Sequence, residues 1–190
     1  HAPKSRSGRI HWLLHELDVP FELCRMDIPR QDGSGARDPD NPHPEGKVPA
    51  LEHDGDLVTE SAAIMLYLTD LYPDRRLGVA AGEDGRGAYL TWLFWYGAVV
   101  EPVYIAEVLG VAEHPVAQAS FRGRAEVADR LIARLQAGPW LMGKRFTAAD
   151  ILLCSPYLYF PEATPDHAAV QDWVNRCTSR PAFVAAQDAD

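Results

Sequence analysis

Residues 47–66, KVPALEHDGDLVTESAAIML, carry three structural signals in succession. Apolar residues alternate around Val48-Pro49, which is typical of a short strand, and Asp54-Gly55 is a pair suited to a tight hairpin turn. Glu60-Ser61 then opens an apolar pattern with helical spacing. The stretch therefore predicts two hairpin strands and a helix, over residues 48–53, 57–59 and 61–71.

The residues before this stretch predict a helix followed by a strand. RIHWLLHEL places Ile10, Leu13, Leu14 and Leu17 at helical spacing, and VPFELCRMDI over residues 19–28 has the composition of a strand. Trp12 falls on the opposite side of the helix from this apolar stripe, so a second surface has to cover it, and a neighbouring domain could do that. Residues 29–46 are rich in Pro, Gly and Asp and predict an irregular loop.

The residues after the stretch contain no convincing strand. Residues 73–87 have many helix breakers and little periodicity, which is typical of a linker. Helical patterns follow over residues 89–109 with a kink expected at Pro102, and over 121–136, 148–158 and 170–185. The predicted fold class is an α/β unit followed by an all-helical half. The predicted divisions are residues 1–73, a linker over 74–86, and residues 87–190.

Composition limits the kinds of partner. The chain has 190 residues, 47% of them hydrophobic, and a formal net charge of -9. An acidic protein is poorly suited to nucleic acid or to an anionic membrane, so a small-molecule ligand is expected. Three separated cysteines suggest no disulfide framework, and no run of 18 apolar residues predicts a membrane span. The first 30 residues lack a signal-peptide apolar run, and we expect a cytoplasmic protein.

Two eye-catching motifs have ordinary structural explanations. His11 and His15 have the spacing of a zinc-binding pair, but the sequence places no third ligand, so no metal is expected. Thr147 and Asp150 have the spacing of a helix capping box, with Asp in place of the usual Glu or Gln. Asp150 is therefore predicted to be a folding determinant rather than a catalytic acid.

Four segments in order resemble the cytosolic glutathione S-transferases, in particular their bacterial and fungal branch. The segments are SRSGRIHWLLHELDVPFE, KVPALEHDGDLVTESAAIMLYLTDLYP, PWLMGKRFTAADILL and VQDWVNRCTSRPAFVAA, and together they span residues 5–185. The resemblance implies a thioredoxin-like glutathione-binding domain, an all-helical domain and a homodimer. It also implies a central strand before the first loop, so we expect several residues to precede His1 in the complete protein.

The resemblance assigns the glutathione site to the opening stretch. A cis Val48-Pro49 bond would turn the Val48 backbone toward the cysteinyl part of glutathione, which it would bind by strand addition. The helix start at Glu60-Ser61 would receive the γ-glutamyl carboxylate, and Lys47 could pair with the glycyl carboxylate. Each assignment has a structural alternative. Pro49 could be an ordinary proline of an edge strand, Ser61 could be only the N-cap of its helix, and Lys47 could be a solvated lysine.

Catalysis by such a site requires an ionised thiol, because a free thiol has a pKa of about 8.5 and is mostly protonated at neutral pH. The candidates that could stabilise the thiolate are Ser5, favoured by position, with Ser7 and Arg6 as alternatives; Ser7 also resembles the helix N-cap. No Tyr or Cys stands in this loop, and the absence of Cys favours conjugation over disulfide chemistry. Tyr96 and Tyr104 are the candidates for the electrophile pocket, although aromatic residues on such a helix more often belong to the core.

The resulting prediction is a transferase that conjugates glutathione, as co-substrate, to a small apolar electrophile. Two alternatives remain at this stage. One is a different glutathione-dependent reaction, such as peroxide reduction, dehalogenation or isomerisation, because a fold does not determine its chemistry. The other is a non-catalytic interaction protein with the same fold.

Overall fold

The computed structural model describes residues 1–188 and begins with a small α/β unit. Its regular elements are α1 (Gly8–Leu17), β1 (Ala50–His53), β2 (Asp56–Thr59) and α2 (Ser61–Leu71). β1 and β2 pair antiparallel, with Ala50 opposite Thr59. Asp54 and Gly55 both have positive φ, as a two-residue hairpin turn requires. The hairpin and α2 confirm the elements predicted from residues 47–66.

The strand predicted over residues 19–28 is wrong, because this segment is extended but forms no strand. A strand needs a neighbouring strand along its length, and within residues 1–188 the only main-chain partner of this segment is His1, while the Asp27 amide donates to the Asp38 carboxylate (3.0 Å). The His1 amino group donates to the Cys24 carbonyl (2.9 Å) and the Met26 amide donates to the His1 carbonyl (2.8 Å). Two such bonds hold residues 24–26 in place without making a ladder.

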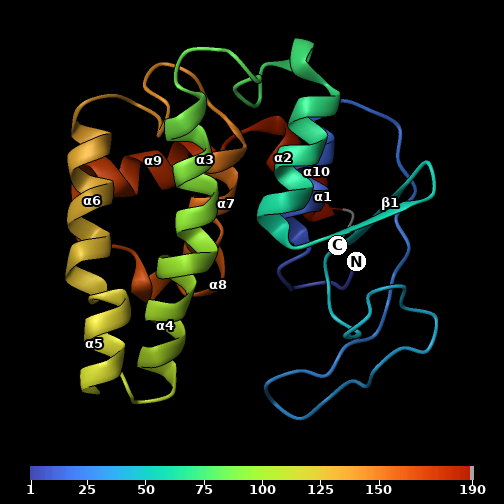
Figure 1. Cartoon of the computed structure of the whole chain (residues 1–190), viewed down its shortest axis with the longest axis horizontal. Coiled ribbons are helices and arrows are strands. Elements are labelled where there is room, and N and C mark those ends of the chain that lie inside the picture. The colour runs from blue at the N-terminus through green and yellow to red at the C-terminus, as the bar shows by residue number, and fades with distance from the viewer. Residues whose placement is uncertain (189–190) are drawn as a thin grey trace.

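The remainder of the described chain is helical (Figure 1). Short 3₁₀ turns η1 (Pro73–Arg75) and η3 (Pro161–Ala163) accompany α3 (Arg86–Trp95), the π-helical turn η2 (Tyr96–Val100), α4 (Glu101–Val108), α5 (Pro115–Phe121), α6 (Arg124–Gln136), α7 (Ala148–Cys154), α8 (Pro156–Tyr159), α9 (Ala168–Thr178) and α10 (Pro181–Asp188). The helix predicted over 121–136 corresponds to α6, the one over 148–158 is divided into α7 and α8, and the one or two helices predicted over 170–185 are the pair α9 and α10. Pro156 and Pro181 stand at the first position of the second helix in these two pairs, where a missing N–H is tolerated.

The long helix that was expected to kink at Pro102 instead widens before it. The Glu101 amide bonds to the Tyr96 carbonyl, five residues back, so one π turn separates α3 from α4. Pro102 has no N–H to give to the carbonyl four residues earlier, and a π turn accommodates this missing bond. Tyr96 is the first residue of this π turn.

The last helix returns to the first unit, and α10 lies beside α1 (Figure 1). Trp12, which is fully buried, packs edge-on against Phe183 of α10 with ring centroids 4.9 Å apart. Glu16 accepts hydrogen bonds from the Trp12 indole and from two nitrogens of Arg180 (2.6 and 2.7 Å). The prediction that a second surface covers Trp12 is confirmed, and the helical half provides that surface.

Asp150 organises the other end of the helical core. Its carboxylate accepts the backbone amides of Thr147 and Leu141 (both 2.9 Å) and the Trp173 indole N–H (3.0 Å). The predicted capping box is therefore present and fully buried. Burial raises the pKa of Asp150 to about 6, although the hydrogen bonds that it accepts oppose this rise.

The segment predicted as a linker is packed rather than free. Leu77 and Val79 are buried, and the Leu77 carbonyl accepts the Ala148 amide (2.8 Å). The exact division of the chain near residues 73 and 87 stays a prediction. Over residues 1–188, every helix is too short or too polar to span a bilayer.

Candidate active site

A cavity of about 590 Å³ lies where the first unit meets the helical half, and it gathers most of the residues predicted to bind glutathione. The predicted residues in its lining are Ser5, Arg6, Lys47, Val48, Pro49, Glu60, Ser61 and Tyr96. They come from the loop before α1, the loop before β1, the start of α2 and the π turn. Residues far apart in the sequence therefore share one site.

The Val48-Pro49 peptide bond is cis, as predicted. The sheet register begins at Ala50, and the Val48 backbone makes no hydrogen bond to any residue in 1–188. Its N–H and C=O are consequently available to an extended peptide ligand. Lys47 lies at the cavity rim, exposed, with its ammonium 3.3 Å from the Glu45 carboxylate. The pairing of Lys47 with a ligand carboxylate stays a prediction.

The N-terminus of α2 is open toward the same cavity. The first helical backbone bond is donated by Ile64 to Glu60, so the preceding amides lack helical partners. Glu60 has a positive φ of 66° and its side chain makes no capping bond. The Ser61 hydroxyl makes no hydrogen bond within residues 1–188 either. Open amides and a free hydroxyl at a helix N-terminus form a suitable receptor for a carboxylate.

The two serines before α1 bond to one another and to the backbone. The Ser5 hydroxyl donates to the Ala2 carbonyl (2.7 Å), and its oxygen lies 2.8 Å from that of Ser7. Ser7 is buried and also contacts the Ala2 carbonyl and His1 Nδ1 (3.1 and 2.9 Å). Ser7 occupies the N-cap position but makes no capping bond with its side chain. Ser5 lines the cavity and Ser7 lies behind it, which favours Ser5 as the hydroxyl nearer to a ligand.

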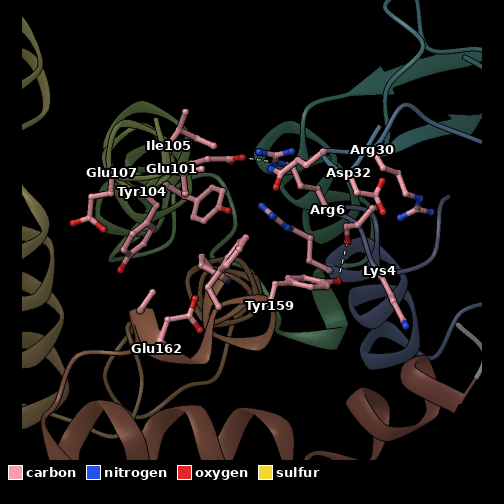
Figure 2. Close-up of a pocket in the computed structure, with 18 of the residues that line it drawn as sticks. Lys4, Arg6, Arg30, Asp32, Glu101, Tyr104, Ile105, Glu107, Tyr159 and Glu162 are labelled. Carbon is pink, nitrogen blue, oxygen red and sulfur yellow. Dashed lines mark hydrogen bonds and ion pairs between the residues drawn. The ribbon is translucent and has the colours of Figure 1, made fainter. Parts of the chain in front are cut away.

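Arg6 does not offer an unpaired positive charge to the site. It forms an ion pair with Glu101 of α4, on the opposite wall (Figure 2). The Arg6 side chain is also half exposed, so solvent screens its charge. Its role as an alternative thiolate partner is weakened by this pairing.

Arg9 is the cavity residue that the sequence prediction missed. It is 5% exposed, lines the cavity from the first turn of α1, and holds its guanidinium 4.7 Å from the centre of the Tyr96 ring. The atoms Nε and Nη1 are buried and have no hydrogen-bond partner within the described chain. A signal was present in the sequence: Arg9 stands four residues before Leu13, on the apolar face of the helix, where a charge is unusual.

A second cavity of about 520 Å³ adjoins the first (Figure 2). The two share Ser5, Arg6, Arg9, Ile28, Pro29, Tyr96 and Glu101 in their linings. Tyr104 and Ile105 on one side face Arg6 and Arg30 on the other (Figure 2). The predicted pocket residues Tyr96 and Tyr104 thus both line this cavity; whether they contact a substrate stays a prediction.

Tyrosine hydroxyls connect the walls of the second cavity. Tyr104 and Tyr157 pair through their hydroxyls (3.0 Å), and Tyr159 donates to the Ser5 carbonyl (2.9 Å), joining α8 to the loop before α1 (Figure 2). Burial raises the pKa of Tyr96, while the charge of Arg9 and a hydrogen bond from it oppose the rise. Burial also raises the pKa of Tyr104. Both phenols are therefore neutral near pH 7.

The histidine pair of α1 lies together, with His11 Nε2 and His15 Nε2 3.1 Å apart. Within residues 1–188, no group of three or more His, Cys, Asp and Glu side chains is arranged to hold a metal ion. Cys24 is exposed, and Cys154 and Cys177 are buried and free.

The structure therefore joins a small α/β unit, with a cis-proline strand entry and an open helix start, to a helical half. Two adjoining cavities lie between them, and the first is suited to a small peptide-like ligand. The family model described as glutathione S-transferase, N-terminal domain, matches residues 1–76. The model described as glutathione S-transferase, C-terminal domain, matches residues 95–181. The chain belongs to the glutathione S-transferase family. The matches confirm the predicted fold class, a thioredoxin-like domain followed by an all-helical domain.

Relatives at moderate identity agree with this assignment. The chain is 28% identical to the glutathione S-transferase GstA of Escherichia coli O157:H7, over 80% of this chain and 77% of that protein. It is also 28% identical to the disulfide-bond oxidoreductase YfcG of Escherichia coli K12, over 95% of this chain and 89% of that protein. The solved structure of a sphingomonad glutathione S-transferase complexed with glutathione matches with a TM-score of 0.76 at 28% identity, over 100% of this chain and 96% of that one.

Proposed function

We propose that this glutathione transferase conjugates the glutathione thiolate to a small, largely apolar electrophile. The observation that carries the proposal is the junction of the two cavities at Ser5, Arg9 and Tyr96. One cavity has the open backbone and helix start suited to a γ-glutamyl peptide, and the other combines apolar and aromatic side chains with a rim of charged ones. A thiol held at the junction faces a second reactant across a short gap, and such proximity lowers the barrier to bimolecular attack.

The proposed reaction has a simple balance. Glutathione loses its thiol proton to solvent, the thiolate attacks an electrophilic carbon, and a sulfur–carbon bond forms. In a substitution, the leaving group departs with the electron pair of the bond that breaks. We assign glutathione binding to Lys47, Val48, Pro49, Glu60 and Ser61 and the electrophile pocket to Tyr96 and Tyr104.

Ser5 is assigned as a hydroxyl donor to the sulfur. A serine hydroxyl has one proton, and that of Ser5 is directed to the Ala2 carbonyl, so it has to rotate when the thiolate binds. Ser7 is the alternative, although it lies deeper and has several partners already.

Three further properties belong to this proposal. Free cysteines fit a reducing cytoplasm, which supports a cytoplasmic enzyme. A homodimer formed by α2 of one subunit and α3 of the other is proposed from the family resemblance. Removal of reactive electrophiles, that is detoxification, is the physiological role that such chemistry would serve.

The test is a titration of glutathione into the full chain, followed by the ultraviolet absorbance of the thiolate as a function of pH. We expect the bound thiol to ionise well below its free pKa of about 8.5, and the enzyme to turn over chlorodinitrobenzene. Ser5→Ala should lower turnover about 100-fold if its hydroxyl stabilises the developing charge. Ser120→Ala, at an exposed serine of α5 outside both cavities, is the matched control.

Failure of glutathione to bind, or binding with an unperturbed thiol, would contradict the proposal. The likeness to YfcG makes disulfide exchange the second reaction to assay. The loop before α1 presents serine hydroxyls and no cysteine thiol, which supports conjugation instead. Rapid reduction of a glutathione mixed disulfide with no conjugation would reverse this preference.

A further inference from the structure

Arg9 is a buried cation at the junction of the two cavities. It lies four residues after Ser5, in the first turn of α1, and contributes to both linings. Its side chain is among the few charged groups in the protein's interior, at 5% exposure. Two of its three guanidinium nitrogens, Nε and Nη1, have no hydrogen-bond partner within the described chain.

The surroundings of Arg9 contain no anion that compensates it. No carboxylate within ion-pair distance of Arg9 occurs in residues 1–188. Glu101, the carboxylate shared by both cavities, is paired with Arg6. Tyr96 offers its ring face and its phenol, and burial raises the pKa of that phenol, so it remains uncharged.

An uncompensated buried guanidinium is costly to stability, because each unsatisfied polar group loses its hydration without gaining a partner. The cost is recovered when a ligand brings an acceptor to the two unpartnered nitrogens. Under the proposed function, the anion that arrives at this junction is the sulfur of glutathione.

The serine hydroxyls alone are poorly arranged for this task. The Ser5 proton is engaged with the Ala2 carbonyl, and the Ser7 hydroxyl is shared among Ser5, Ala2 and His1. Arginine differs from serine because all of its N–H groups donate and its charge persists at every physiological pH. Two nitrogens of Arg9, Nε and Nη1, donate to no acceptor within the described chain.

We propose that Arg9 is a catalytic residue that holds the glutathione thiolate through its unpartnered guanidinium nitrogens, with Ser5 as an auxiliary donor. This inference rests on the proposed function. Arg9 transfers no proton: the thiol proton leaves to solvent on binding, and the guanidinium stabilises the negative sulfur until the sulfur–carbon bond forms. The neutral Tyr96 ring helps to hold the guanidinium in place through a cation–π contact.

The experiment measures the ionisation of bound glutathione in full-length wild type, Arg9→Met and Arg9→Lys. Removing an opposite charge next to an ionised group typically moves its pKa by about 1 to 3 pH units. We therefore expect the bound-thiol pKa to rise by that amount in Arg9→Met and by less in Arg9→Lys, which keeps a cation. Arg130→Met is the matched control, because Arg130 also stacks on aromatic rings but lies outside both cavities. It should leave the thiol pKa unchanged.

S-methylglutathione separates this role from a structural one, since it fills the site but cannot form a thiolate. It should bind wild type and Arg9→Met with similar affinity, which also shows that the variant is folded. If Arg9→Met does not fold, Arg9→Gln carries the same expectation with a side chain closer in shape.

Two adverse outcomes are distinguishable. An equally lowered thiol pKa in wild type and Arg9→Met overturns the role of Arg9 and leaves the transferase intact. A wild-type protein that binds glutathione without lowering its thiol pKa overturns both proposals.

Discussion

At the scale of single residues, Asp150 shows how one buried carboxylate fixes several segments. It joins the start of α7 to Leu141 and to Trp173 of α9 through four hydrogen bonds. A buried carboxylate that accepts this many bonds is a packing device, although its charge is expensive to bury. The balance of these effects raises its pKa to about 6, and this produces a testable dependence of stability on pH.

The folded protein binds the Asp150 proton more tightly than the unfolded chain does, because the pKa of this carboxyl is about 6 when folded and 3.8 when unfolded. Its contribution to stability is therefore complete below about pH 4 and is lost as pH rises through about 6. The loss is on the order of 3 kcal/mol. Asp150→Asn cannot titrate, so the difference in unfolding free energy between wild type and this variant should be larger at pH 4 than at pH 7. Urea denaturation at both pH values measures it.

Asp172→Asn, at an exposed position of α9, is the control and should show no such change. An equal penalty for Asp150→Asn at the two pH values would mean that Asp150 is ionised in the folded protein throughout this range.

The same scale explains which site residues could be found from the sequence. Val48, Pro49 and Ser61 belong to one continuous stretch, and local strand and helix signals place them. Arg9 could not be assigned in this way, because its importance depends on Tyr96 and on the cavity walls, which come from distant segments. The ion pair between Arg6 and Glu101 likewise depends on the tertiary structure, so the sequence could not show that the charge of Arg6 is already paired.

At the scale of elements, helix positions and the hairpin follow from local pattern, whereas pairing with a strand distant in the sequence does not. The helix over residues 61–71 matches α2 because its start and its apolar spacing are both local signals. Residues 19–28 have strand composition, yet a ladder depends on a neighbour that composition cannot supply. The π turn was also missed, since Pro102 predicts a break but not the widening that absorbs it.

The N-terminus of α2 allows binding and stability to be separated. The Ser61 hydroxyl makes no capping bond, so Ser61→Ala should leave the unfolding free energy nearly unchanged. The lost bond to a ligand carboxylate is worth about 1.5 to 3 kcal/mol, and we expect glutathione affinity to fall about 10- to 100-fold. Calorimetric titration and urea denaturation measure the two quantities. A large loss of stability with unchanged affinity would show that Ser61 is only a structural residue.

At the scale of the whole molecule, the contact between α1 and α10 joins residues from the two ends of the chain. Glu16 is nearly buried and holds two nitrogens of Arg180. Glu16→Gln removes the charge and one acceptor oxygen, and it should lower the unfolding free energy by about 1 to 3 kcal/mol. Glu22→Gln, at an exposed and unpaired position, is the control in the same urea experiment. If Glu16→Gln lowers the unfolding free energy no more than the control does, the aromatic contacts alone hold α1 against α10.

Assembly is the last property that the surface of the molecule suggests. Exposed Gly87, Thr91, Phe94 and Ala98 recur three or four residues apart along α3 and its π turn, and so form one stripe. Phe94 is 52% exposed at the centre of this stripe, and Leu71 at the end of α2 is also exposed. Apolar side chains gathered on one face are typical of an interaction surface, and small residues beside them permit close approach of a second helix.

If this stripe forms the proposed homodimer, the wild-type mass in solution should be twice 21.0 kDa. Phe94→Asp would place an unpaired charge at the centre of the interface, and it should yield a monomer with unchanged helical content. Val116→Asp alters an even more exposed apolar residue on α5 and should remain dimeric. Light scattering after size exclusion distinguishes these outcomes. A monomeric wild type would refute the dimer itself, whereas a dimeric Phe94→Asp would place its interface on another face.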